Sequence, residues 1–163
     1  MSAKEYLMSV GIIDAKVKII EANIKKIRRE LYEIGDIGVS SPWPDGQPHG
    51  TAMGDPTGAK ATKLADSINA KRDELKNKLL EYEYEQVQLH SALWSRRMDV
   101  LNTIEKIFSA DEPITKTYYI LLTERYIDGK TWEQIAVDIG YTIRHVWRLH
   151  GEALNRMEMI LNE

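Results

Sequence analysis

Two arginines four residues apart, Arg144 and Arg148, have the type and spacing that fit one kind of chemistry. Residues four apart on a helix lie on the same side, so both side chains would project together. Arginine presents paired N–H donors in a planar fork, which matches phosphate oxygens and the O6 and N7 acceptors of guanine. His145 and Trp147 lie between them in the sequence. This cluster predicts a surface that binds nucleic acid.

No other group of residues predicts catalysis or metal binding. The chain has no cysteine, which excludes disulfides, thiolate zinc sites and a cysteine nucleophile. His145 and His150 are five apart and lack partners in a metal pattern, so we interpret them as DNA-facing or surface histidines. Nothing supports catalysis by His49 or His90. We therefore expect no enzyme activity, no catalytic residue, no metal site and no cofactor.

Three short helices are expected to position the arginine cluster. Pro113 suits the first turn of the first helix, and an Asp-Gly pair ends it. Thr131 and Gln134 form a capping box at the start of the second helix, and Thr142 caps the third. The expected ranges are about 114–127, 132–139 and 143–161.

The second and third of these helices fit a helix-turn-helix motif. The crossing of the two helices leaves room only for a small residue, and Ala136 lies there. Gly140 follows four residues later, where the turn needs a residue that tolerates positive φ. Five apolar residues are expected to lock the pair and seat it on the preceding helix: Ile135, Ile139, Tyr141, Val146 and Leu149. The alternative is a helical corner with no role in nucleic-acid binding.

In such a motif the third helix enters the major groove with its N-terminal turns facing the bases. The amide of Thr142 lies near the positive end of the helix, where it suits a phosphate. Trp147 suits contact with a thymine methyl or a sugar, or alternatively packing against the long helices. The predicted DNA-binding residues are Thr142, Ile143, Arg144, His145, Trp147 and Arg148.

The charge distribution limits the affinity of this segment for DNA. Residues 1–109 contain 16 basic and 16 acidic residues, whereas residues 110–163 contain six basic and nine acidic residues. The whole net charge of −3 therefore lies in the segment predicted to bind DNA. Because nonspecific affinity comes mainly from phosphate neutralisation, the segment alone should bind weakly. Either a few basic residues are concentrated on one face, or dimerisation or a partner supplies the missing affinity.

The rest of the chain is predicted to be a long helical hairpin over residues 1–109. Nine apolar residues alternate at spacings of four and three from Tyr6 to Ile34, which is typical of a coiled-coil seam. Ser2 and Glu5 can cap this helix, and Gly35 is placed to end it. A second helix is expected over about 62–108. The two would be about 45 and 70 Å long, and this mismatch favours a homodimer through the long helices.

The segment 35–59 between the long helices is rich in glycine and proline, which predicts an irregular loop. Trp43 lies in it between two prolines, either as an exposed recognition feature or packed back on the hairpin. The fold class is thus all-α, with the hairpin followed by a DNA-binding domain over 113–163. No apolar run is long enough for a signal peptide or a membrane span, so we expect a cytoplasmic protein with no membrane contact.

The C-terminal residues also resemble a known family. The runs 125–136 and 140–154, with Arg-His-Val-Trp-Arg-Leu-His-Gly-Glu-Ala-Leu as their most specific part, resemble region 4 of bacterial sigma factors. They are also similar to regulators of Gram-positive phages and prophages, an uncharacterised family and the late-gene activators of RinA and ArpU type. The resemblance implies a helix-turn-helix that places base and phosphate contacts on residues 142–145, 147 and 148. Ile143 and Trp147 replace charged residues usual in sigma factors, which implies a different DNA site.

Three functions remain open at this stage. The first is a sequence-specific transcription regulator of phage or prophage origin, which binds double-stranded DNA and contacts host RNA polymerase. The second is a DNA-packaging component of small-terminase type, although there the DNA-binding module usually comes first. The third is a coiled-coil protein that binds a host factor. Assembly mass separates the first two, since a ring of eight or more subunits favours packaging.

Overall fold

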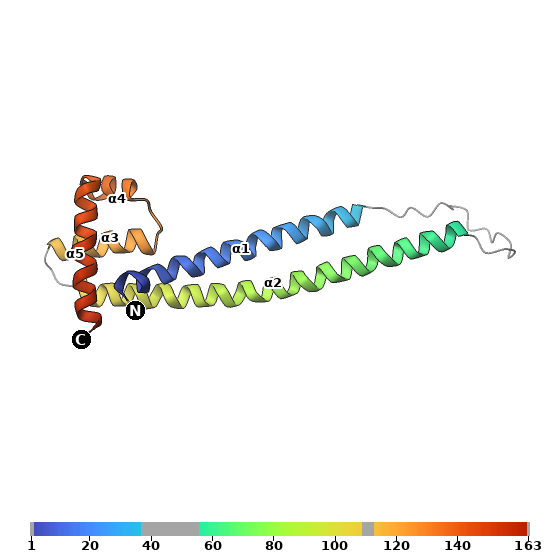
Figure 1. Ribbon diagram of the computed structural model, residues 1–163, viewed down its shortest axis with the longest axis horizontal. Helices are drawn as coiled ribbons and strands as arrows, with labels where there is room; N and C mark the ends of the chain where they lie inside the picture. The colour runs from blue at the N-terminus through green and yellow to red at the C-terminus, as the bar shows by residue number, and fades with distance from the viewer. Residues whose placement is uncertain (1, 37–55, 109–112, 163) are drawn as a thin grey trace. The chain divides into compact units, whose positions relative to one another are not determined.

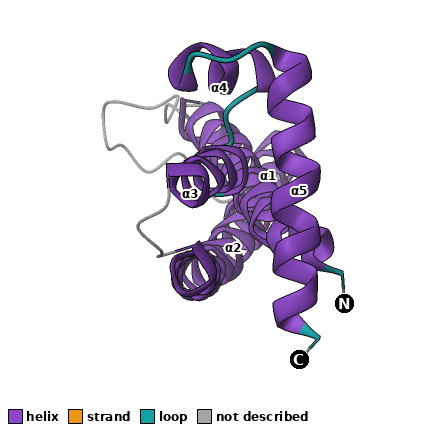
Figure 2. Cartoon of the chain, turned by 90° about the vertical axis from the view of Figure 1, so that its left-hand side faces the viewer, coloured by secondary structure: helices purple, strands orange, loops and turns teal. Residues whose placement is uncertain are grey.

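A computed structural model describes residues 2–36, 56–108 and 113–162, and these residues form helices and no strand (Figure 1). The all-α prediction is confirmed for this part of the chain. The helices are α1 (Ala3–Asp36), α2 (Pro56–Phe108), α3 (Pro113–Tyr126), α4 (Trp132–Ile139) and α5 (Ile143–Leu161). Figure 2 shows the same helices joined by short loops where the chain between them is described. Among the described helices, none combines the length and apolar character needed to cross a membrane.

The ends of the two long helices differ from the prediction. Gly35 does not end α1, which continues to Asp36. The second helix begins at Pro56, six residues before the expected start, so residues 56–59 belong to a helix. Proline is favourable at a first helical turn because its fixed φ suits the helix and its missing N–H needs no partner. The remainder of the predicted loop, Trp43 included, lies outside the described residues.

The chain divides into two compact units, each described here by itself. The terminal unit consists of Met1–Lys18 and Val87–Glu163, and the middle unit is Ile19–Gln86. The domain boundary expected at residues 109–113 does not coincide with this division. The reason is that the first turns of α1 and the last turns of α2 share a core with α3, α4 and α5.

The middle unit is held by the seam predicted for the long helices. Ile20, Ile24 and Ile27 of α1 are buried, together with Leu75 of α2. The spacing of four and three along α1 keeps these side chains on one face. Arg28 forms an ion pair with Glu83 at 2.8 Å between the two helices. Because this pair is exposed, apolar burial contributes most of the stability here.

The terminal unit has one continuous apolar core. Its fully buried members come from every helix of the unit: Leu7, Val10, Val100, Ile104, Leu121, Leu122, Ile135, Val146, Ala153 and Met157. Helices α3, α4 and α5 contact one another pairwise. Leu7 has no exposed area although the predicted seam names its neighbour Tyr6. The heptad pattern predicts one apolar stripe along α1. In the terminal unit, α1 shares its core with α3, α4 and α5 as well as α2, so a wider face of α1 is buried.

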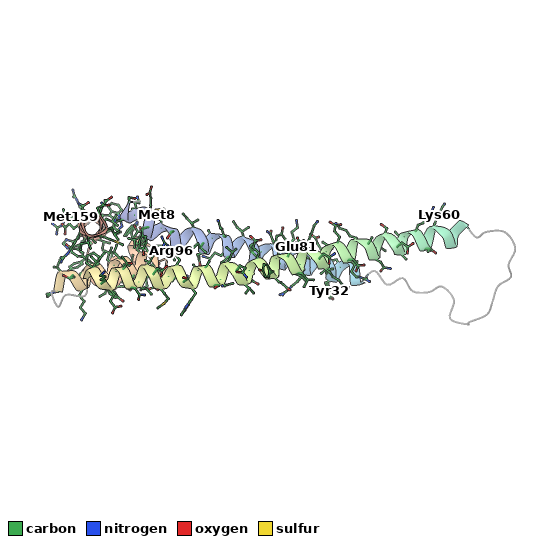
Figure 3. The ribbon with its side chains drawn as sticks, turned by 90° about the horizontal axis from the view of Figure 1, so that it is seen from below. Met8, Tyr32, Lys60, Glu81, Arg96 and Met159 are labelled. Atoms are coloured by element: carbon green, nitrogen blue, oxygen red, sulfur yellow. The ribbon has the colours of Figure 1, made fainter. Side chains whose placement is uncertain are left out.

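Polar contacts explain why Tyr6 and Arg96 lie at the edge of this core. The Tyr6 hydroxyl is 3.0 Å from the Thr103 hydroxyl, and the Arg96 guanidinium lies 4.4 Å from the centre of the Tyr6 ring. Arg96 also donates from Nε to the Ser9 hydroxyl at 2.6 Å. Figure 3 labels Arg96 among the side chains of the ribbon. The charge of Arg96 at the edge of the core is thus accommodated by a ring and a hydroxyl.

Candidate nucleic-acid interface

The predicted caps fix where α4 and α5 begin. The Thr131 hydroxyl accepts from the Gln134 backbone N–H at 3.3 Å, and the Gln134 side chain accepts from the Thr131 N–H at 2.9 Å. The Thr142 hydroxyl accepts from the His145 N–H at 3.3 Å. Both predicted caps are therefore confirmed. Each satisfies a backbone donor that the first helical turn leaves without a partner.

The turn between α4 and α5 depends on Gly140, whose φ is 72°. Its N–H donates to the Val137 carbonyl at 3.2 Å, and the Tyr141 N–H donates to the Ala136 carbonyl at 2.9 Å. This pair of bonds is the Schellman motif, which ends a helix with a left-handed residue. The predicted need for positive φ at Gly140 is confirmed, and the short turn fixes how α5 leaves α4.

Most of the predicted locking residues are buried as expected. Ile135 and Val146 have no exposed area, Ala136 and Leu149 are nearly buried, and Ile139 packs on the core. Tyr141 was predicted to be a further apolar locking residue, and this is wrong. Its side chain is 45% exposed, and its ring lies 4.5 Å from the His145 ring. Tyr141 lies directly after the turn at Gly140, and its ring packs beside His145 of α5 and not in the core.

Five of the six predicted DNA-binding residues gather on one open face at the start of α5. They line a shallow hollow of 560 Å³, and they are Thr142, Arg144, His145, Trp147 and Arg148. The Trp147 side chain is 56% exposed, so it does not pack into the core. We name this set the α5 face. Ile143 does not belong to it, because its half-buried side chain packs against the core.

The two arginines of the α5 face have different surroundings. Arg144 is exposed and forms no ion pair or hydrogen bond with the described residues. Arg148 donates from Nη2 to His145 Nδ1 at 3.2 Å, and its Nε lies 3.7 Å from Glu152 Oε1. Because arginine can only donate, the acceptor Nδ1 implies the His145 tautomer protonated on Nε2. Arg144 therefore has all its N–H donors available, whereas Arg148 is partly engaged.

Sequence reasoning missed two residues that connect the α5 face to the core. The Glu152 Oε2 accepts a hydrogen bond from the Tyr118 hydroxyl at 2.9 Å. Burial and this hydrogen bond raise the pKa of Tyr118, so its hydroxyl keeps its proton and donates. The spacing of Arg148 and Glu152, four residues apart, would have indicated an ion pair. The hydrogen bond from Tyr118 comes from α3, and no local sequence pattern predicts it.

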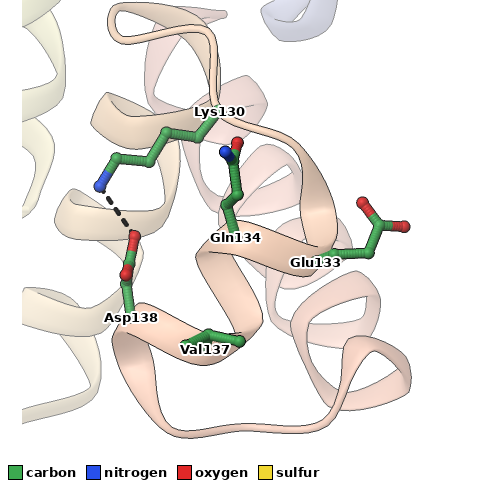
Figure 4. A pocket seen from close by; sticks show the side chains of 5 residues that line it. All are labelled: Lys130, Glu133, Gln134, Val137 and Asp138. Atoms are coloured by element: carbon green, nitrogen blue, oxygen red, sulfur yellow. Dashed lines mark hydrogen bonds and ion pairs between the residues drawn. The ribbon is translucent and has the colours of Figure 1, made fainter.

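A second hollow of 560 Å³ lies beside α4, lined by Lys130, Glu133, Gln134, Val137 and Asp138 (Figure 4). Its cation is already engaged, since Lys130 Nζ lies 2.7 Å from Glu124 and 2.8 Å from Asp138. The hydrogen bonds to Asp138 and Glu124 raise the pKa of Lys130. With carboxylates in surplus, this hollow does not suit an anion. The α5 face instead presents two guanidinium groups, those of Arg144 and Arg148.

His150 is not a surface histidine, contrary to the prediction. Its ring is half-buried, with Nε2 2.9 Å from the Tyr126 hydroxyl and the Trp132 ring 4.8 Å away. Burial, together with the positive charges of Lys4 and Arg125, lowers the pKa of His150 to about 4. The ring is therefore neutral near pH 7 and serves the packing of α3, α4 and α5.

Among the described residues, no group of three or more His, Asp or Glu side chains could hold a metal ion. Comparisons with models of protein families, with curated proteins and with solved structures gave no match. Two guanidinium groups, a hydroxyl, an imidazole and an indole on one open face are suited to a polyanion with hydrogen-bonding edges.

Proposed function

We propose that this chain is a sequence-specific regulator of transcription that reads the major groove of double-stranded DNA with α5. The observation that carries the proposal is the α5 face, with Arg144 and Arg148 exposed on the first turns of a capped helix. The short turn at Gly140 places this helix end beside α4, as in a helix-turn-helix. The resemblance of residues 140–154 to sigma region 4 supports a phage or prophage regulator of the late-activator type.

Each member of the α5 face has a chemical role in this proposal. Arg144 and Arg148 donate to guanine O6 and N7, the contact most often used to read a base pair. Trp147 contacts a thymine methyl or a sugar with its exposed edge. Thr142 lies at the positive end of the α5 dipole, where its backbone amide binds a phosphate. His145 adds a donor beside Arg148.

Residues 110–163 carry a net negative charge, so affinity for DNA needs a second source. We propose that a homodimer through the long helices supplies it. Within the terminal unit, α2 carries an outward stripe of Val87, Trp94 and Met98, which are 64%, 69% and 38% exposed. Their spacings of seven and four continue a heptad repeat. A large exposed aromatic in such a stripe is typical of an interaction surface. Host RNA polymerase is the other partner that this stripe would suit.

The reading face is tested with the double variant Arg144→Ala, Arg148→Ala. We expect its affinity for a duplex selected by the wild-type protein from a random library to fall about thirtyfold or more, because a bidentate arginine–guanine contact is worth roughly 1–3 kcal/mol. The matched control is Lys16→Ala, Lys25→Ala, which removes the same charge from exposed positions of α1. Retained affinity in the arginine variant, with unchanged helicity by circular dichroism, would exclude α5 as the reading helix.

One observation favours a second candidate function, binding of a host protein through the coiled coil. The acidic surplus of residues 110–163 opposes DNA binding, while the Trp94 stripe is suited to a protein partner. Selection of duplexes from a random library decides between the two. Enrichment of one sequence at moderate salt supports the regulator, and its absence favours the interaction protein. A ring of eight or more subunits in a mass measurement would instead favour a packaging component.

A further inference from the structure

We propose that Glu152, held by Tyr118, determines the specificity of the α5 face by positioning Arg148 and limiting its binding to phosphate. The inference rests on the proposed function and describes how the same face separates its own site from other DNA. It is carried by a chain of contacts that leads from the core to the reading arginine.

The chain of contacts begins at Tyr118, whose ring is 8% exposed and meets the Phe108 ring edge-on at 5.8 Å. The Tyr118 hydroxyl donates to Glu152 Oε2 at 2.9 Å. The other carboxylate oxygen, Oε1, lies 3.7 Å from Arg148 Nε. The carboxylate is therefore oriented from the core, and it in turn orients the guanidinium.

This arrangement differs from an ordinary surface ion pair. Two exposed, flexible side chains four residues apart gain little by pairing, because both lose rotamer freedom. Here the Glu152 carboxylate is already tethered to a buried ring, so less freedom remains to be lost. Arg144, one turn earlier, has no such tether among the described residues. The two arginines are thus unequal, because only Arg148 has side-chain partners, His145 and Glu152, among the described residues.

The tether acts differently on phosphates and on bases. A phosphate that binds Arg148 comes close to the Glu152 carboxylate, whose negative charge repels it. Phosphates occur at every position of a duplex, so this penalty applies to all sequences. A base edge is neutral and can be reached by the N–H groups that Glu152 and His145 leave available. Glu152 therefore lowers nonspecific binding more than specific binding, which raises the ratio between them.

The test measures the affinity of purified full-length protein for two duplexes. One is the duplex that the wild-type protein selects from a random library, and the other is a scrambled duplex of equal length and composition. The variants are Glu152→Gln and Tyr118→Phe. Their matched controls are Glu158→Gln, an exposed carboxylate on the same helix, and Tyr119→Phe, the neighbouring tyrosine of α3.

We expect Glu152→Gln to raise affinity for the scrambled duplex about twofold to fivefold, the effect of one exposed ion pair. The ratio of specific to nonspecific affinity should fall by a similar factor, and it should also fall in Tyr118→Phe. Glu158→Gln should raise both affinities together and leave the ratio unchanged. Glu152 is exposed, so its variant carries the test even if Tyr118→Phe fails to fold.

Two results would overturn the inference, and they are distinguishable. If both variants keep the wild-type ratio while Arg144→Ala, Arg148→Ala loses specific binding, Glu152 has no part in specificity and the reading face stands. If the wild-type protein selects no sequence, the proposed function fails and the inference fails with it.

Discussion

His150 shows how a single residue of α5 can have a role unrelated to the arginines on the same helix. Its neutral ring is packed between Tyr126 and Trp132, near the positive charges of Lys4 and Arg125. The spacing of His145 and His150 argued against a metal site, but it could not predict that the His150 ring is half-buried. The residue types that make its environment come from α1, α3 and α4, and only the folded chain brings them together.

The lowered pKa of His150 predicts a pH dependence of stability. In the unfolded chain a histidine titrates near 6.5, whereas in the folded protein its pKa is about 4. Between these values only the unfolded chain takes up the proton, so the free energy of unfolding falls as pH drops from about 6.5 to 4. The expected loss is roughly 1–2 kcal/mol, below the full effect of the shift because the ring is only half-buried.

This prediction is checked by urea unfolding at pH 7 and pH 4.5. The His150→Gln variant should lose part of the difference in unfolding free energy between the two pH values, since glutamine does not titrate. Equal pH dependence in the variant and the wild-type protein would show that His150 does not titrate differently on folding.

At the scale of elements, local chemistry decides how well a helix boundary can be predicted. Thr131, Thr142 and Gly140 act on backbone groups within one turn of themselves, and the ends they define were predicted correctly. The end predicted at Gly35 differs by one residue from Asp36, the last residue of α1. The heptad pattern predicted the middle-unit seam but not the wider face buried by Leu7, which depends on packing partners far along the chain.

The turn between α4 and α5 can be tested with one substitution at two glycines. Gly140→Ala should lower the free energy of unfolding by about 1–2 kcal/mol, because φ of 72° is costly for any residue with a Cβ. Gly151→Ala should instead raise it by up to about 1 kcal/mol, since alanine favours a helix and its Cβ meets no atom within 4 Å. Chemical unfolding of both variants measures the effects, and equal changes of the same sign would contradict the left-handed turn.

At the scale of the whole molecule, the exposed stripe of α2 predicts self-association. We expect sedimentation of the wild-type protein at micromolar concentration to give a dimer mass. Trp94→Glu should shift it to the monomer, because a charge would be buried in the interface. Tyr32→Glu, which alters an aromatic of α1 that is 75% exposed, should leave the dimer intact. A monomer mass for the wild-type protein would contradict the proposed homodimer.

The shared core of the terminal unit also sets the order in which the chain can fold as it is made. Leu7 and Met157 are members of one apolar cluster although 150 residues separate them in the sequence. A ribosome adds roughly 5–20 residues per second, so the first turns of α1 wait for many seconds before α5 exists. During that time their apolar side chains depend on other cover, such as a chaperone or a neighbouring chain. The helix that we propose reads DNA is thus also the last piece needed to close the core.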